Sequence, residues 1–170
     1  MKATLINLLT EIQTLHVQFN QPATPPAAAN ELHALQQQAL DQLKYELPIS
    51  YLELLTHSNG LDWNGTQLYG THDLTRLGAT GRTSYDRMGL VEANLLWREY
   101  EPNTRYIFFA ESGDVLYCHN LTNDKFEIVD RITTELIYEP SSFNSCEELL
   151  QTLLNHMLNR YEVKGAENGG

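Results

Sequence analysis

The spacing of apolar side chains predicts helices in the first part of the chain. Apolar residues recur at steps of three and four over residues 2–19, which places one apolar stripe on a first helix. Pro22, Pro25 and Pro26 then break the pattern, because proline does not fit inside a helix. Helical spacing resumes over residues 27–43, so a second helix is expected there.

The stretch LPISYLELLTHSNGLDWNG, residues 47–65, predicts a short helix followed by a hairpin. Pro48 can occupy the first helical turn without losing a hydrogen bond, and apolar residues follow it. Gly60 is placed to take the left-handed conformation that ends a helix. Asn64-Gly65 is the dipeptide preferred in a two-residue type I′ hairpin turn. The pattern therefore indicates a helix, a glycine stop and a hairpin.

The segment after this hairpin has weaker signals. Residues 70–89 carry four glycines and little periodicity, which predicts a long exposed loop. Residues 90–100 then have the composition of a helix, and Leu95, Leu96 and Trp97 are expected on or near its buried side.

The pattern changes to β-forming residues with a period of two in the second half of the chain. Four segments are typical of strands, and they are RYIFFAE, DVLYCHN, KFEIVDR and ELIYEP. The residues between them suit tight turns. Successive strands with short links indicate an antiparallel meander.

A capping box predicts the start of the last helix. Ser145 is followed three residues later by Glu148, and an amphipathic leucine stripe comes next. The whole order predicts an α+β fold: N-terminal helices, an antiparallel sheet of about five to six strands, and a C-terminal helix packed on that sheet. We expect one domain over residues 1–162, which includes an N-terminal helical extension over 1–45. Residues 163–170 have nothing to bury and are expected to be a flexible tail.

The amino-acid composition is acidic. The chain has 170 residues, a formal net charge of −11 and a sequence pI near 4.8. Binding to a nucleic-acid backbone needs clustered Lys and Arg, so nucleic acid is not an expected partner, and a charged partner would be basic. The acids are scattered along the sequence, whereas a mimic of DNA needs a dense acidic face.

The sequence shows no signal for export or membrane insertion. Glu11, Gln13 and His16 interrupt the N-terminal apolar stretch, and no run approaches the roughly 18 apolar residues of a membrane span. Cys118 and Cys146 lack C-x-x-C spacing, which is typical of reduced thiols. We therefore expect a cytoplasmic protein with no membrane partner.

Candidate catalytic and metal-binding groups are few. Cys118 and His119 are neighbours, but adjacent side chains of a strand point to opposite faces, so Cys118 is expected inside and His119 outward. His57, His72 and Asp73 lack the spacing of known metal motifs. We expect no catalytic residue, no metal site and no cofactor.

Hydrolysis remains an alternative that these residue types allow. It would use His72, Asp73 or a carboxylate pair such as Glu99 and Glu101. Paired carboxylates do acid–base work only when their environments separate their pKa values, and no motif supplies a nucleophile with a base in reach.

Aromatic residues next to acids form the candidate binding surface. Trp and Tyr concentrate in the energetically important parts of protein interfaces. The candidate partner-binding residues are Asp62, Trp63, Tyr69, Glu99, Tyr100 and Glu101. The alternative, in which these aromatics form the rim of the core, stays equally open.

Three segments resemble the signature of the SUKH superfamily. The first is residues 47–65, and its matching residues are Leu47, Pro48, Tyr51, Leu54, Asn59 and Gly60. The second is the turn Gly113-Asp114, which is followed by two sheet strands. The third is SSFNSCEELLQTLL, and its matching residues are Ser142, Phe143, Leu149 and Leu150. Together they cover about residues 45–160, and the two leading helices with the long loop resemble a YrhA-like branch.

The resemblance implies an α+β domain with an immunity role. Immunity proteins of this type bind and neutralise a cognate toxin domain in the producing cell. The acidic charge makes a basic toxin domain, such as a nuclease, the expected partner of a monomer or weak dimer. The family has no shared catalytic residues, and the matching positions are structural. Other members are regulators, so an intracellular regulatory or scaffold protein without a toxin partner remains the alternative.

Overall fold

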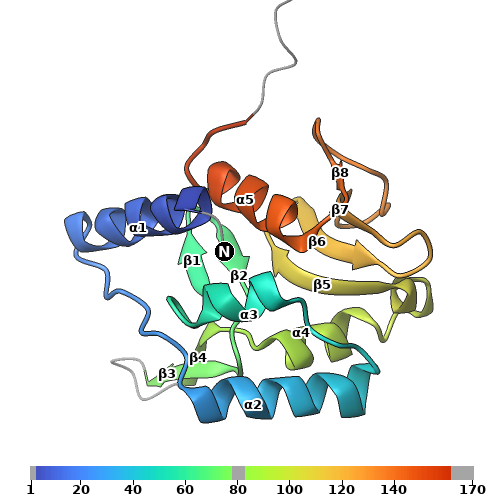
Figure 1. The fold of residues 1–170 in the computed structure, drawn as a ribbon, viewed down its shortest axis with the longest axis horizontal. Helices are drawn as coiled ribbons and strands as arrows, with labels where there is room; N and C mark the ends of the chain where they lie inside the picture. Colours follow the sequence, from blue (N-terminus) through green and yellow to red (C-terminus); the bar gives the residue numbers. More distant parts are fainter. Residues whose placement is uncertain (1–2, 78–82, 162–170) are drawn as a thin grey trace, which may run out of the picture.

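Within residues 3–77 and 83–161, which the computed structural model describes, the central feature is a six-stranded antiparallel sheet (Figure 1). Its strands, in spatial order, are β1 (Leu61–Trp63), β2 (Thr66–Leu68), β5 (Tyr106–Glu111), β6 (Val115–Asn120), β7 (Lys125–Asp130) and β8 (Ser142–Phe143). The α+β fold class predicted from the sequence is confirmed.

Helices cover both faces of this sheet. They are α1 (Ala3–Gln18), α2 (Ala29–Gln38), α3 (Ile49–Leu55), α4 (Leu90–Trp97) and α5 (Cys146–Met157). A π-helical turn, Ala39–Leu43, continues α2, and a 3-10 turn, Glu101–Arg105, follows α4. Helix α5 lies beside α1 and α3 and packs on β6, β7 and β8, whereas α4 contacts β5 (Figure 1). None of the helices in the described ranges has the length and apolar character of a membrane span.

The hairpin predicted at Asn64-Gly65 is confirmed. Both residues have positive φ, 54° and 76°, as a type I′ turn requires. Gly60 has the predicted left-handed φ of 80°, but its predicted role is wrong, because α3 ends at Leu55 and the glycine begins the hairpin instead. A Cβ there would lie 3.0 Å from the carbonyl oxygen of Leu68, so the tight packing of the hairpin requires glycine.

The long loop predicted over residues 70–89 is wrong. Its described parts form a two-stranded antiparallel hairpin, β3 (Leu74–Leu77) and β4 (Thr83–Arg87). Gly70 and Gly89 pair at its base, and the Asp73 carboxylate accepts a hydrogen bond of 2.8 Å from the backbone N–H of Gly89. Pairing of the two segments with each other gives the backbone its hydrogen bonds, so a strong apolar pattern is not needed.

The fourth strand predicted at ELIYEP is also wrong. Only Leu136 forms an isolated bridge, to Val129 of β7. Thr134 and Tyr138 have positive φ, which interrupts an extended backbone on both sides of that bridge. The edge of β7 is completed by the two residues of β8 instead.

The predicted start and stripe of the last helix are confirmed. The Ser145 hydroxyl accepts from the Glu148 backbone N–H at 3.3 Å, and the Glu148 carboxylate accepts from the Ser145 N–H at 3.2 Å. The buried apolar residues of α5 include Leu149, Leu150, Leu153, Leu154 and Met157. The tail predicted over 163–170 lies outside the described residues.

His156 on α5 gives the fold a predictable pH dependence. It is buried with its Nδ1 2.9 Å from the Tyr117 hydroxyl, and burial lowers its pKa to about 4. The unfolded chain, with a histidine pKa near 6.5, therefore binds a proton that the folded chain does not bind between these two values. Stability should fall as the pH drops from about 6.5 to about 4.

We expect His156→Gln to flatten the dependence of Tm on pH in that window, because glutamine can bond to Tyr117 without titrating. Thermal unfolding followed by circular dichroism at a series of pH values measures this. The matched control is His33→Gln, which replaces an exposed histidine of α2 and should leave the profile unchanged. A wild-type profile for His156→Gln would contradict the assignment.

Candidate functional site

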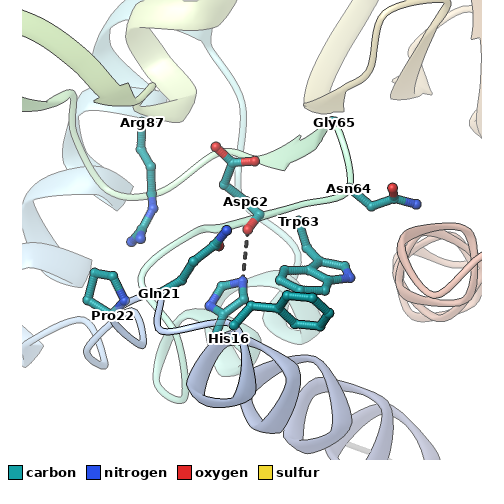
Figure 2. A pocket seen from close by; sticks show the side chains of 9 residues that line it. His16, Gln21, Pro22, Asp62, Trp63, Asn64, Gly65 and Arg87 are labelled. Atoms are coloured by element: carbon teal, nitrogen blue, oxygen red, sulfur yellow. Dashed lines mark hydrogen bonds between the residues drawn. The ribbon is translucent and has the colours of Figure 1, made fainter.

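A cleft of about 570 Å³ opens at the edge of the sheet, where the end of α1 meets the β1–β2 hairpin (Figure 2). Its lining residues are His16, Phe19, Gln21, Pro22, Asp62, Trp63, Asn64, Gly65 and Arg87. The volume lies within the range of small-molecule and side-chain pockets. The cleft is therefore the first candidate site.

One wall of the cleft is aromatic. The Trp63 ring lies between two rings from α1 and its end, with centroid distances of 5.0 Å to His16 and 5.7 Å to Phe19. Phe19 remains 65% exposed although it follows an amphipathic helix directly. Asn20 turns the chain there with a φ of 55°. This arrangement leaves apolar ring surface open to a partner.

The hydrogen bond of His16 fixes its tautomer. Its Nε2 lies 2.9 Å from the backbone carbonyl oxygen of Asp62. Because a carbonyl only accepts, Nε2 carries the proton, and Nδ1 of the neutral ring is an acceptor. Within the part of the chain that the structure describes, this Nδ1 is buried and has no hydrogen-bond partner. The cleft thus holds an unused acceptor.

A row of polar residues, one from each of three neighbouring strands, runs across the sheet from the cleft. Asp62 of β1 is opposite Gln67 of β2, and Gln67 is opposite Glu111 of β5. Residues directly opposite each other project from the same face of a sheet. A hollow of about 300 Å³ follows this row, and its lining residues are Asp62, Gly65, Gln67, Glu111, Ser112, Gly113 and Arg131.

A chain of hydrogen bonds holds the Glu111 end of the row in place. The Trp97 Nε1 donates to the Tyr69 hydroxyl at 3.0 Å, and that hydroxyl donates to the Glu111 carboxylate at 3.0 Å. The Arg131 guanidinium lies 4.8 Å from the centre of the Trp97 ring and donates to the Ser112 carbonyl at 2.9 Å. Burial, and then the Glu111 carboxylate, keep the pKa of Tyr69 well above its usual value, so its hydroxyl stays a donor.

A third hollow, also of about 300 Å³, continues from Glu111 and Arg131 onto α4. It is lined in addition by Met88, Leu96 and Trp97, and Leu96 is 58% exposed. The cleft and the two hollows share residues, so they form one continuous surface. We call this surface the open face.

The structure separates the predicted partner-binding residues into three kinds. Asp62 and Trp63 line the cleft. Tyr69 is fully buried, so its predicted place on the surface is wrong, and it instead orients Glu111. The other three, Glu99, Tyr100 and Glu101, are exposed after the end of α4, and none of them is among the described lining of the open face.

Several residues of the open face were missed in the sequence. They are His16, Phe19, Gln67, Trp97, Glu111 and Arg131. A large exposed ring directly after a helix, such as Phe19, is the one signal that could have indicated its place. The row that ends at Glu111 depends on strand register, which a single sequence does not specify here.

The positions of the family resemblance hold the fold together. Leu47, Tyr51, Leu54 and Asn59 are buried, and the Tyr51 hydroxyl donates to the Tyr69 carbonyl at 2.6 Å. Pro48 precedes α3, and Phe143 lies in β8 against the core. Gly113-Asp114 forms the β5–β6 turn, and Gly60 begins the first hairpin.

The Cys118–His119 pair has the alternation that the sequence predicts. Burial raises the pKa of Cys118 far above its usual value, and its Sγ donates to the Glu127 carbonyl at 3.5 Å. His119 is on the opposite face, but it does not point outward: its side chain is 12% exposed, stacks on Phe126 at 4.1 Å and lies 2.8 Å from the Tyr45 hydroxyl. The two side chains cannot form a nucleophile and base.

The residues considered for a metal site have different surroundings. His57 is exposed after α3, whereas His72 Nδ1 lies 3.5 Å from the Glu31 carboxylate. The Asp73 carboxylate accepts a hydrogen bond from the Gly89 backbone N–H. Among the described residues, no group of three or more His, Cys, Asp or Glu side chains is placed to hold a metal ion.

Comparison with known proteins gives no family. No protein-family model matches the chain, and no curated protein matches it. The resemblance to the SUKH superfamily therefore rests on the three sequence segments alone.

Proposed function

We propose that this protein is a non-enzymatic immunity protein of the SUKH type, which binds and neutralises a toxin domain in the cytoplasm of the producing cell. The observation that carries this proposal is the open face, which combines exposed ring and aliphatic surface with acidic side chains on firmly held elements. Aromatic side chains such as Trp63 are enriched in protein-binding sites.

The charge of the chain supports a basic partner. A net charge of −11 attracts a basic protein over several ångströms and raises the rate of encounter. On the open face itself, Asp62 and Glu111 are close to Arg87 and Arg131, so the surface is mixed rather than uniformly acidic. We infer that the whole-molecule charge speeds association, while the local contacts decide which partner binds.

The state of the thiols supports a role without covalent chemistry. Burial raises the pKa of Cys146 to about 12 and the pKa of Cys118 in the same direction. Thiols with raised pKa values are poor nucleophiles at neutral pH. We propose instead a steric and electrostatic contribution to neutralisation, in which this protein covers the working surface of the toxin.

Co-expression with the toxin domain encoded beside the gene tests the proposal. Cells should survive when this protein is present and die when it is absent. Gln67→Arg places a positive charge in the middle of the open face and should abolish protection. Gln38→Arg makes the same change on an exposed position of α2 and should preserve protection. Equal killing with and without the protein would contradict the immunity role and favour the regulatory alternative.

A further inference from the structure

We infer that the hollow beside α4 binds a free α-amino acid with an apolar side chain. This inference goes beyond the immunity role and does not depend on it. It rests on three features of the hollow: a carboxylate with an unused oxygen, a guanidinium with unused N–H groups, and apolar surface beside both. The volume of about 300 Å³ is at the lower end of the range for small-molecule pockets, which suits a ligand of this size.

The carboxylate belongs to Glu111, and only one of its oxygens is used. Its Oε2 accepts from the Tyr69 hydroxyl at 3.0 Å, and the Trp97 Nε1 donates to the same hydroxyl at 3.0 Å. Within residues 3–77 and 83–161, the other oxygen, Oε1, has no hydrogen-bond partner. Tyr69 is fully buried, so its bond restricts the position of Glu111. The hollow therefore offers an acceptor to a cationic N–H group.

The guanidinium belongs to Arg131 and is also held in place. Its Nη1 donates to the Ser112 carbonyl at 2.9 Å, and its plane lies over the Trp97 ring at 4.8 Å. The backbone N–H of Arg131 donates to the Asp114 carbonyl at 2.9 Å, which fixes the chain at the same point. In the described part of the chain, Nε and Nη2 have no hydrogen-bond partner. These donors suit a carboxylate, which a guanidinium can bind through two parallel bonds.

Glu111 and Arg131 line the same hollow without pairing with each other. Among the described residues, they form no ion pair, although each is half-buried. A simple anion drawn to Arg131 would be repelled by Glu111, and a simple cation would be repelled by Arg131. An α-amino acid carries an ammonium and a carboxylate on one carbon atom, so it can bridge two opposite charges that do not touch. The hollow therefore favours a zwitterion over either ion alone.

The remaining lining selects an apolar side chain. It consists of Met88, Leu96 and Trp97, and Leu96 is 58% exposed. An apolar side chain placed on this surface leaves water, and so does the surface that it covers. Asp62 is not among the described lining of this hollow, and it has interactions of its own. The expected ligand is therefore an amino acid of the leucine or methionine kind.

The test is an NMR titration of the full chain with L-leucine, followed through the two tryptophan indole signals. Trp97 lines the hollow and Trp63 lines the cleft, so the Trp97 signal alone should shift; the variant Trp63→Phe assigns the two signals. N-acetyl-leucine lacks the ammonium and leucinamide lacks the carboxylate, so each should bind about tenfold more weakly than leucine. Glycine, which has no side chain to cover Leu96, should also bind more weakly.

Two variants connect each charge of the ligand to one residue. Glu111→Gln keeps an acceptor for the Tyr69 hydroxyl, but it should weaken leucine binding by about tenfold and remove the preference for leucine over N-acetyl-leucine. Arg131→Gln should remove the preference for leucine over leucinamide. The matched control Glu46→Gln removes an exposed carboxylate before α3 and should leave the affinity unchanged. If a variant does not fold, the comparison of probes on the wild-type chain still decides.

Four outcomes would overturn the inference. They are equal binding of leucine and its two derivatives, no shift of the Trp97 signal with leucine, a shift of the Trp63 signal alone, and full leucine affinity in Glu111→Gln. The titration requires no toxin, so its failure leaves the proposed immunity role standing. Loss of that role in the co-expression experiment would equally leave the amino-acid site standing.

Discussion

Replacing Asn94 with leucine is expected to lower the free energy of unfolding by about 2–4 kcal/mol. The Asn94 side chain is fully buried between α4 and β5. Its amide donates to the carbonyls of Leu90 and Phe108, and its oxygen accepts from the Phe108 N–H, each at 2.8 Å. Leucine has a similar volume but leaves both backbone groups of Phe108 without these partners.

Urea unfolding measures this loss. Asn30→Leu is the matched control, because it makes the same change on an exposed position of α2 and should shift stability by less than about 0.5 kcal/mol. If Asn94→Leu unfolds at the wild-type urea concentration, the amide does not join the helix to the sheet.

Under the proposed immunity function, replacing Trp63 with alanine is expected to weaken binding of the toxin domain by about 30-fold or more, which corresponds to about 2 kcal/mol. The Trp63 ring forms the centre of the aromatic wall, and its loss removes surface from the cleft and support from Phe19. Truncation of a central tryptophan is among the most damaging changes at protein interfaces.

Tyr100→Ala is the matched control for this change. Tyr100 is a large exposed aromatic residue of the same sequence-predicted set, but it lies outside the described lining of the open face. Its removal should leave the affinity within about twofold of wild type. Calorimetric titration of the toxin domain into each folded variant measures both affinities. Equal losses of affinity in the two variants would show that the binding surface is not at the cleft.

The sequence correctly predicted elements that are specified by residues only a few positions apart. Asn64-Gly65 specifies a type I′ turn through its own backbone preference, and the Ser145–Glu148 box specifies a helix start through side chains three residues apart. Both predictions are confirmed because the physical cause lies within a few residues of each element.

Predictions that depended on tertiary contacts were less accurate. Leu95 and Leu96 were expected on or near the buried side of α4, but they are exposed, and the polar Asn94 is buried instead. An eight-residue helix contains too few turns to define an apolar stripe, and the bonds that favour burial of Asn94 come from β5. Only the structure shows those bonds.

The candidate site was predictable in part for the same reason. Asp62 and Trp63 are adjacent in the sequence, so predicting the hairpin was enough to place both residues in the same strand. Tyr69 is also an aromatic residue of the predicted set, yet it is fully buried, and the Trp97 indole of α4 donates a hydrogen bond to its hydroxyl. Glu111 joins the face through pairing with β2, more than 40 residues earlier in the chain.

The rate of association between this protein and its proposed toxin partner, measured at increasing salt, tests the central claim most directly. A net charge of −11 meeting a basic partner predicts an association rate that falls by about tenfold or more between about 0.05 and 0.5 M salt. Gln67→Arg should raise the dissociation rate as well, because it disturbs the open face. Absence of a complex, or a rate that does not change with salt, would contradict the account.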